Sequence, residues 1–294
     1  MGYMHVENLY KNQMIMAFKR CYALEKIHGT SAHVAFKEGK FDLFSGGESE
    51  VRFAKLFNTA ALIEKIKAMG PHCDIEGITI FGEAYGGSCQ KMSGTYGKEL
   101  KFIVFDVQIG KSWLSVPDMA EVAANLGLEV VHFEEGPTDL AWIDAQRDAP
   151  SVQAKRNGIV EAKPREGVVL RPPFEVITNS GERVISKHKG DAFNERATAQ
   201  KVVDPEKLKV LEGAQAIAIE WVTEMRLEHV LQKFPAGTSV EKTKEVIGAM
   251  IEDVTREAKG EIVDSPDARK AIGKRTADLF KAREKNKLKE LRDD

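Results

Sequence analysis

The stretch EKIHGTSAHVAF, residues 25–36, places a lysine directly before a histidine–glycine turn, between two runs that are typical of β-strands. Lys26 could be a solvated surface charge, which is the ordinary situation of a lysine. It could also be an amine placed as a nucleophile at a strand end, because the pKa of a lysine falls when it is desolvated or lies near other cations. The stretch alone leaves both interpretations open, so the rest of the chain must decide between them.

Length and composition predict a globular protein of two domains. The chain has 294 residues, of which 43% are hydrophobic, enough to fill a sizeable core. Its three cysteines, Cys21, Cys73 and Cys89, lack CxxC spacing, which favours buried free thiols in a reducing compartment. No signal peptide or long apolar segment is visible, so we expect a cytoplasmic protein without a membrane partner. The net charge of −2 neither indicates nor excludes nucleic-acid binding, because lysines can gather on one face.

Short strand signals dominate the first two thirds of the chain. Runs rich in β-branched and aromatic residues lie at 31–36, 40–45, 74–85, 100–109, 128–133, 166–172 and 183–189. Two helices interrupt them: 57–70, with Asn58 as its N-cap, and 115–127, with Pro117 in its first turn and Gly127 at its end. Strict βαβ alternation is absent. We therefore expect an α+β fold of mixed, mostly antiparallel sheets with flanking helices.

The pattern becomes helical after Pro205. Three helices are predicted: 205–234, 238–259 with a capping box from Thr238 to Glu241, and 265–291 starting at Ser265 and Pro266. The expected apolar stripes run through Leu211, Ile219, Val222 and Met225, and through Val240, Ile247, Ile251 and Val254. The chain is therefore expected to divide into a β-rich domain, residues 1–203, and a small all-helical domain, residues 204–294.

Several charged residues of the β-rich part occupy unusual places. Glu83 ends an apolar strand beside glycines, Asp106 interrupts a nearly continuous apolar strand, and Glu166 precedes another. Each could be an ordinary solvated or paired carboxylate. Lys187 and Lys189 alternate about His188 at strand spacing, so both lysines are predicted to lie on one face. The pair could lie at a solvated strand edge, or the two lysines could bind an anionic ligand between them.

Taken in order, these signals resemble the motifs of one enzyme superfamily. The segments Lys26-Ile27-His28-Gly29, Phe81-Gly82-Glu83, Phe105-Asp106, Glu166-Gly167-Val168-Val169 and Lys187-His188-Lys189 match motifs I, III, IIIa, IV and V of the covalent nucleotidyltransferases. Within that superfamily the chain most resembles the RNA ligase 2 family of nick-sealing RNA ligases, over residues 20–200. The histidine in motif I and the helical rather than OB-fold region after motif V separate it from DNA ligases and capping enzymes.

The resemblance implies an ATP-dependent RNA ligase that joins 3′-OH and 5′-phosphate RNA ends at nicks in duplex RNA. Lys26 would attack the α-phosphorus of ATP and form lysyl-AMP, and the AMP would then pass to the RNA 5′-phosphate. Lys187 and Lys189 would hold the phosphates, and His28 would lie near them. Arginine could not replace the nucleophile, since it does not lose its proton in proteins.

The resemblance also assigns nucleotide contacts. Glu83 would bind the ribose hydroxyls, Phe105 would stack on adenine, and Glu166 would orient Mg²⁺ or Mn²⁺ through its water shell. The remaining nucleotide-binding positions are expected at Glu25, Ile27 and Arg52, although no tight motif fixes the arginine. Ser31 stands where family members often carry asparagine.

RNA, as a nicked or RNA-containing duplex, is the expected partner of a monomeric enzyme. The expected duplex contacts of the helical domain are Arg269, Lys270, Lys274, Arg275, Lys281 and Arg283. A solvated amphipathic helix face explains the same residues equally well. The rival functions are a ligase or guanylyltransferase with another acceptor, a non-catalytic RNA-binding module, and a purely structural protein. The last two leave the reactive lysine and the paired lysines unexplained.

Overall fold

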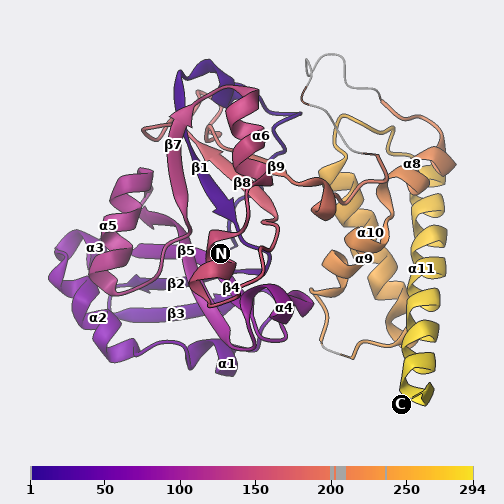
Figure 1. Ribbon diagram of the computed structural model, residues 1–294, viewed down its shortest axis with the longest axis horizontal. Coiled ribbons are helices and arrows are strands. Elements are labelled where there is room, and N and C mark those ends of the chain that lie inside the picture. The colour runs from indigo at the N-terminus through magenta and orange to yellow at the C-terminus, as the bar shows by residue number, and fades with distance from the viewer. Residues whose placement is uncertain (1, 199–201, 203–209, 236, 294) are drawn as a thin grey trace. The chain divides into compact units, whose positions relative to one another are not determined.

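The computed structural model describes residues 2–198, 202, 210–235 and 237–293, with side chains as far as Lys287. The chain forms two compact units, Met1–Gly190 and Asp191–Asp294 (Figure 1). The division predicted between residues 203 and 204 lies outside the described residues. Each unit has its own hydrophobic core.

The first unit contains two β-sheets. The four-stranded sheet has the order β7 (Phe133–Pro137), β1 (Arg20–Lys26), β8 (Gly167–Arg171) and β9 (Ser186–Lys189). The five-stranded sheet has the order β3 (Lys40–Ser45), β2 (Thr30–Lys37), β4 (Ile78–Gly86), β5 (Leu100–Ile109) and β6 (Ser112–Trp113). Neighbouring strands within these two sheets pair antiparallel. The prediction of mostly antiparallel sheets is therefore confirmed for the described residues.

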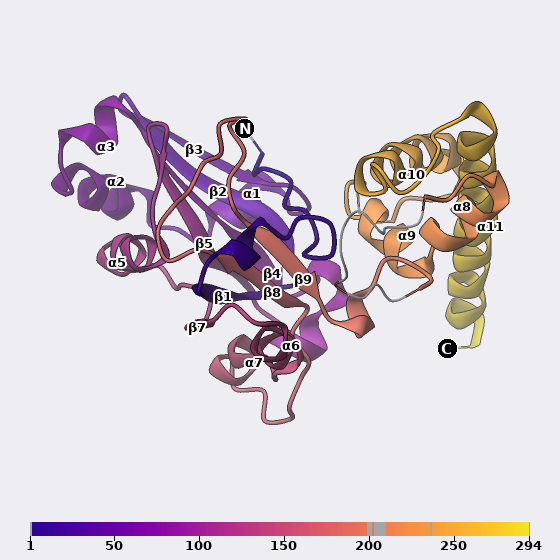
Figure 2. The ribbon, with the colours of Figure 1, turned by 90° about the horizontal axis from the view of Figure 1, so that it is seen from above.

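Short helices cover the outer faces of the sheets. They are α1 (Glu50–Ala54), α2 (Thr59–Ala68), α3 (Pro71–Ile75), α4 (Ser93–Tyr96), α5 (Val116–Leu126), α6 (Leu140–Asp148) and α7 (Val152–Arg156), with 3-10 turns η1 (Met14–Ala17) and η2 (Cys89–Lys91). Figure 2 shows α6 and α7 on one side of the four-stranded sheet. The opposite face of that sheet is left for the side chains of the candidate site.

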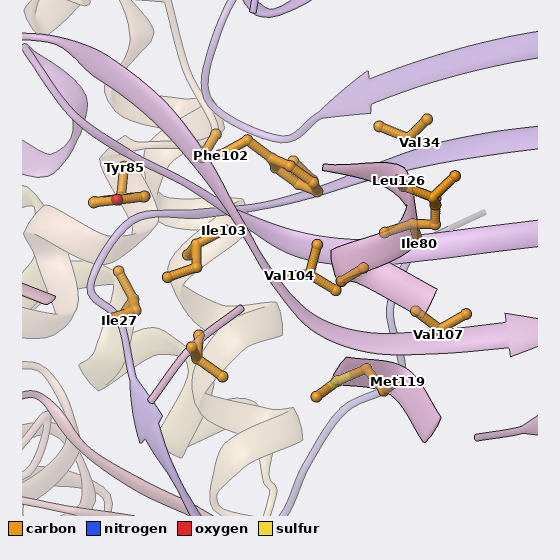
Figure 3. Close-up of a cluster of buried hydrophobic side chains, with 14 of the residues drawn as sticks. Ile27, Val34, Ile80, Tyr85, Phe102, Ile103, Val104, Val107, Met119 and Leu126 are labelled. Carbon is orange, nitrogen blue, oxygen red and sulfur yellow. The ribbon is translucent and has the colours of Figure 1, made fainter. Parts of the chain in front are cut away.

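The core of the first unit lies on the face of the five-stranded sheet that α2 and α5 cover. Val34, Ile80 and Val107 stand side by side on neighbouring strands there and are fully buried, and Met119 of α5 packs with them (Figure 3). Antiparallel strands present alternate residues to each face. A β-bulge between Phe81 and Gly82 shifts this alternation where β4 meets β5.

Several local predictions for the first unit are confirmed. The side chain of Asn58 caps α2, and Pro117 lies in the first turn of α5. α5 ends at Gly127 in the left-handed conformation, with φ +75°, which a glycine adopts without strain. Strands β3 and β5 begin and end at the predicted residues.

Other local predictions for this unit are wrong. The run at 128–133 is mostly irregular, and β7 begins only at Phe133. The strand expected from residue 74 begins at Ile78, because α3 extends to Ile75. Helices α6 and α7 were not predicted at all.

The second unit is helical. It contains η3 (Asp191–Phe193), α8 (Ala214–Trp221), α9 (Glu224–Leu231), η5 (Val240–Lys242), α10 (Thr243–Glu257) and α11 (Pro266–Asp293). Its core includes Trp221, Leu227, Met250, Ile272 and Phe280. The Arg226 guanidinium is buried and donates to Asp253 at 2.7 Å, so this buried charge is compensated.

The helix predicted at 205–234 is two helices in its described part, because the chain breaks at Val222 and Thr223. Ile219, expected in the apolar stripe, is 55% exposed. The capping box from Thr238 to Glu241 is wrong: a 3-10 turn occupies 240–242, and α10 starts at Thr243.

The predicted start of the last helix is confirmed, since Ser265 Oγ accepts a hydrogen bond from the Ala268 N–H. Among the described residues, no helix is both long and apolar enough to cross a membrane.

Candidate active site

The site is built on three neighbouring strands of the four-stranded sheet. Lys26, the last residue of β1, stands opposite Gly167 at the start of β8, and Gly167 stands opposite Lys189 of β9. Residues paired across antiparallel strands project from the same face, so Lys26 and Lys189 flank a position that has no side chain. Lys187 lies on the same face one row further along, opposite Val169. The predicted common face of Lys187 and Lys189 is therefore confirmed.

Glu166 is the centre of this arrangement. Its Oε2 lies 2.9 Å from Lys26 Nζ and 3.1 Å from His28 Nδ1, and its Oε1 lies 3.1 Å from Lys189 Nζ. The carboxylate is 1% exposed. One buried carboxylate thus binds nitrogen groups from two segments, residues 26–28 and residue 189, that are distant from each other in the sequence.

Gly167 makes this close approach possible. Its φ of +149° lies outside the range that residues with a Cβ normally adopt. A Cβ atom at this position would lie 2.2 Å from the carbonyl oxygen of His188 on β9. The absence of a side chain is therefore required both by the backbone and by the packing of β8 against β9.

Glu83 approaches the same turn from the five-stranded sheet. Its Oε1 accepts a hydrogen bond of 3.2 Å from the N–H of Gly29. Gly29 is in close contact with β4, since an added Cβ would lie 2.3 Å from the carbonyl oxygen of Ala84. Because the Gly29 N–H binds Oε1 of the carboxylate, the Oε2 of Glu83 retains acceptor capacity for a ligand.

The two carboxylates have opposite electrostatic behaviour. Burial opposes the ionisation of Glu166, but Lys26 and Lys189 outweigh it and hold the pKa of Glu166 well below its ordinary value. Burial raises the pKa of Glu83 to about 8, against the opposing effect of Lys26 and with a further increase from Glu166. Two neighbouring carboxyl groups with separated pKa values are typical of active sites.

Asp106 lies in a buried ion network next to the site. It accepts hydrogen bonds from Arg171 at 3.0 Å, from Arg183 at 2.6 Å and from the Tyr3 hydroxyl at 2.7 Å. From the sequence Asp106 was expected to be paired with a basic group, and its partners are Arg171 and Arg183. Arg171 belongs to β8 and Asp106 to β5, so the network joins the two sheets.

A family model described as RNA ligase matches residues 19–189, which is more than half of the chain. The chain belongs to the RNA ligase family. The matched region begins just before β1 and ends at Lys189, and so contains all the strands that carry the site residues. A comparison with curated protein sequences finds no match.

Solved RNA ligase structures share the fold. A lysine-to-alanine variant of the Naegleria gruberi RNA ligase with ATP and Mn has a TM-score of 0.51 and 17% identity, over 65% of this chain and 56% of the other. A lysine-to-methionine variant with AMP and Mn, and the enzyme with PPi, each give 0.51 and 16%, over 66% and 57%. The match thus spans little more than half of those ligases.

Three further nucleotide-binding residues predicted from the ligase resemblance, Glu25, Ile27 and Arg52, have partners other than Glu166. The Glu25 carboxylate accepts hydrogen bonds from Ser151 Oγ and from the N–H of Val152 at the start of α7. Its side chain therefore lies on the opposite face of the sheet from Lys26. The Ile27 side chain is in the core. Arg52 pairs with Glu48 at 3.0 Å and reaches Ser88 Oγ at 3.4 Å, in the loop after β4.

Phe105 is partly buried between the two sheets. The ring of Tyr3 meets it edge-on, with centroids 4.9 Å apart. The ring of Tyr3 also contacts the rings of Phe81 and Trp113. Whether Phe105 stacks on adenine is not tested by this arrangement and stays a prediction. Ser31 stands opposite Glu83 in the pairing of β2 with β4, so it lies on the same face as that carboxylate.

Three contacts of the site were missed by sequence reasoning. Tyr3 closes the arginine network, Gln90 donates to the carbonyl of Gly29 at 2.8 Å, and the Tyr96 hydroxyl accepts from the N–H of His28 at 3.3 Å. Neither Gln90 and Lys91 nor Tyr96 belongs to a sequence motif that would mark it as part of the site. Only the dense glycines of residues 86–97 signalled an unusual loop.

The described residues hold no group of three or more His, Cys, Asp or Glu side chains that could bind a metal ion. Glu166 has an oxygen, Oε1, that is buried and makes no hydrogen bond among those residues, although Lys189 is near. A site of one or two carboxylates suits Mg²⁺ or Mn²⁺, which keeps water and takes its other ligands from phosphates. Glu166, with Glu83 beside it, fits that mode.

Proposed function

We propose that this chain is an ATP-dependent RNA ligase that joins 3′-OH and 5′-phosphate ends, at nicks in duplex RNA, through lysyl-AMP and RNA-adenylate intermediates. The observation that carries the proposal is the cluster of Lys26, His28 and Lys189 around Glu166. The family match and the ATP, AMP and PPi named for the Naegleria ligase structures support it.

In the first step Lys26 acts as the nucleophile. Its Nζ, having lost a proton, forms a bond to the α-phosphorus of ATP, while the bond from that phosphorus to the pyrophosphate oxygen breaks. The products are lysyl-AMP and pyrophosphate. Lys187 and Lys189 share the face of Lys26, which suits them to neutralise the phosphate charges that build up in the transition state.

In the second step an oxygen of the RNA 5′-phosphate attacks the phosphorus of lysyl-AMP, and the Lys26–phosphorus bond breaks. In the third step the 3′-hydroxyl attacks the activated 5′-phosphate and releases AMP. The same cationic face serves each transfer, because each one moves negative charge between phosphate oxygens.

The ion pair with Glu166 orients Lys26. The attack on the α-phosphorus requires the amine to lose a proton. A divalent cation, when bound, would supply positive charge to the phosphates and to Glu166. Glu83 is placed to accept hydrogen bonds from ribose hydroxyls with the oxygen that Gly29 leaves open.

The first test is the transfer of label from α-labelled ATP and magnesium to the protein, read on a denaturing gel. We expect label on the wild type, none on the Lys26→Ala variant, and normal labelling of a Lys37→Ala control, since Lys37 is an exposed lysine near the far end of the next strand. Label from GTP instead of ATP would overturn ATP as the donor. Absence of label from either, with an unmodified protein mass, would overturn the ligase function.

The proposed duplex preference rests on the last helix of the second unit. Of the six basic residues predicted to contact RNA, Arg269 pairs with Asp264, Arg283 pairs with Glu228, and Arg275 donates to the carbonyl of Val222. These arginines stabilise the helical unit. They are less available for phosphate than the sequence suggested.

The remaining three, Lys270, Lys274 and Lys281, are exposed and share one face of α11 with Lys285. At about 100° per residue these four lysines fall within an arc of about 60°, along roughly 22 Å of helix. Within the described part of the chain none of the four makes an ion pair. We call them the lysine stripe and assign to it contacts with duplex phosphates.

Substrate choice is tested with matched substrates. Wild-type protein is incubated with ATP and a nicked RNA duplex, the same strands without the bridging complement, and a nicked DNA duplex. We expect sealing of the RNA nick at a rate at least roughly tenfold above the others, since a bound duplex aligns the two ends. Faster joining of the unbridged strands would contradict the nick preference while leaving RNA ligation intact.

A further inference from the structure

The loop between β4 and β5 holds the turn that follows Lys26. Gln90 Nε2 donates to the carbonyl oxygen of Gly29 at 2.8 Å, and the Tyr96 hydroxyl accepts from the N–H of His28 at 3.3 Å. From β4 itself, Glu83 accepts from the N–H of Gly29. Three side chains thus fix three successive peptide groups between the nucleophile and β2. Of these side chains, Gln90 and Tyr96 have no role in the motifs of the proposed reaction, and only Gln90 binds the turn through a carbonyl.

Gln90 occupies an unfavourable backbone conformation. Its φ and ψ are 58° and 15°, and the φ of Lys91 is 57°. Residues with a Cβ rarely adopt this left-handed region, and such strain persists only where the surrounding contacts determine it. Three other positions of positive φ in this region, Gly86, Gly87 and Gly97, are glycines. A glycine at position 90 would be free of strain but would lose the bond to Gly29.

The amide of Gln90 is also only half satisfied. Its Oε1 is buried and makes no hydrogen bond among the described residues. An unpaired buried acceptor is unfavourable, and the carbonyl of Gly29 fixes the amide with its nitrogen toward the turn. Backbone strain and an unpaired oxygen each reduce stability. Both occur at Gln90, the residue whose side chain binds the carbonyl of Gly29.

We infer that Gln90 is a positioning residue for the nucleotidyl transfer: it holds the Lys26–Gly29 turn so that Lys26 and His28 both remain against Glu166. The inference rests on the proposed function. It predicts that stability and reaction rate respond in opposite directions to the loss of the side chain. A residue that only stabilised the loop would not separate them.

The test compares Gln90→Gly with the wild type in two measurements, the thermal midpoint and the single-turnover rate of label transfer from ATP. We expect the midpoint to stay or rise, because glycine relieves the left-handed strain. We expect the rate at saturating ATP to fall roughly tenfold or more, with a smaller change in KM, because the nucleophile loses its alignment.

Two further variants sharpen the result. Glu38→Gly relieves a left-handed residue, φ 49°, in the turn between β2 and β3, and should raise the midpoint without changing the rate. Gln90→Glu loses the donor as a carboxylate but regains an O–H donor when protonated. Its rate relative to the wild type should therefore rise as the pH falls.

The outcomes separate the two levels of inference. If wild type takes label and Gln90→Gly keeps a rate within twofold of it, the positioning role is overturned and the ligase proposal stands. A Gln90→Glu ratio that does not change with pH also counts against the role. If wild type itself takes no label from either nucleotide and its mass is unmodified, the proposed function fails, and the inference fails with it.

Discussion

Lys26 Nζ lies 2.9 Å from Glu166 Oε2, although the two residues are 140 positions apart in the chain. Residues at the end of β1 and just before β8 are brought together because these strands pair antiparallel, with Lys26 opposite Gly167. Under the proposed function, the nucleophile is thus held by the carboxylate that the family resemblance assigns to the metal. A single side chain would then serve both the amine and the cation.

Replacing Glu166 with glutamine should abolish this arrangement. We expect the rate of lysyl-AMP formation to fall roughly 100-fold or more, because Lys26, His28 and Lys189 lose their common partner. The matched control is Glu161→Gln, which removes an exposed carboxylate paired with Lys163 and should leave the rate unchanged. Single-turnover labelling with ATP measures both, and an unimpaired Glu166→Gln variant would contradict the assigned centre.

The same variant makes a prediction about acid stability. The pKa of Glu166 in the folded protein is well below its ordinary value of 4.5, because Lys26 and Lys189 outweigh burial. The ionised group therefore stabilises the fold above pH 4.5, and this contribution is lost as the pH falls below that value. Urea unfolding of the wild type and Glu166→Gln should show a stability difference that shrinks from pH 6 toward pH 3. A difference that grows in acid would show that the assigned pKa shift has the wrong sign.

Gly167→Ala tests the backbone requirement beside the site. The added Cβ would lie 2.2 Å from the His188 carbonyl, at a φ of +149°. We expect a loss of about 1–3 kcal/mol in the free energy of unfolding, together with slower labelling, because β8 and β9 must move apart. Gly248→Ala in α10 is the control: its Cβ meets nothing within 4 Å, and alanine there should stabilise the helix by about 0.5–1 kcal/mol. Equal unfolding free energies for Gly167→Ala and wild type would refute the close contact.

The sequence predicted those parts of the protein that depend on local patterns. Asn58 is a cap whose side chain accepts a hydrogen bond from the N–H three residues ahead, so the signal and its partner lie in one short window. The apolar run of β5 predicted its exact limits, since a strand buried on both faces needs little else. The resemblance to the family motifs predicted that Lys26, Glu166 and Lys189 belong to one site, and these three side chains are in contact.

Features fixed by distant contacts could not be predicted. α7 has five residues, and Glu25, which accepts from its first N–H groups, precedes it by more than 120 positions. The sequence indicated that Asp106 needs a partner but did not identify Arg171 and Arg183, which lie 65 and 77 positions away. Gln90 shows its role only through a hydrogen bond to Gly29, 61 positions away. No periodicity or composition in a single sequence reports such pairs.

Glu83 should make the protein less stable as the pH rises through the neutral range. Its pKa is raised by burial from 4.5 to about 8, so the folded state holds a proton that the unfolded state releases. This contribution is complete below pH 4.5 and is lost as the pH rises through 8, with a slope of at most about 1.4 kcal/mol per pH unit. Partial exposure of the side chain makes the slope shallower. The stability of wild type minus that of Glu83→Gln, measured by urea unfolding, should fall between pH 5 and pH 8, and a constant difference would contradict the raised pKa.

The lysine stripe of α11 should control RNA affinity without affecting the first step. Changing Lys270, Lys274, Lys281 and Lys285 together to alanine removes four charges from one helix face, so binding of a nicked RNA duplex should weaken and become less sensitive to salt. The slope of log affinity against log salt should decrease by about three to four, near 0.9 per lost phosphate contact. Labelling by ATP should stay normal, because the nucleotide site belongs to the other unit. The fourfold arginine variant keeps the charge and should keep the slope. If the alanine variant binds with an unchanged slope, RNA does not contact the stripe, and the duplex must be held by the strands that carry Lys26.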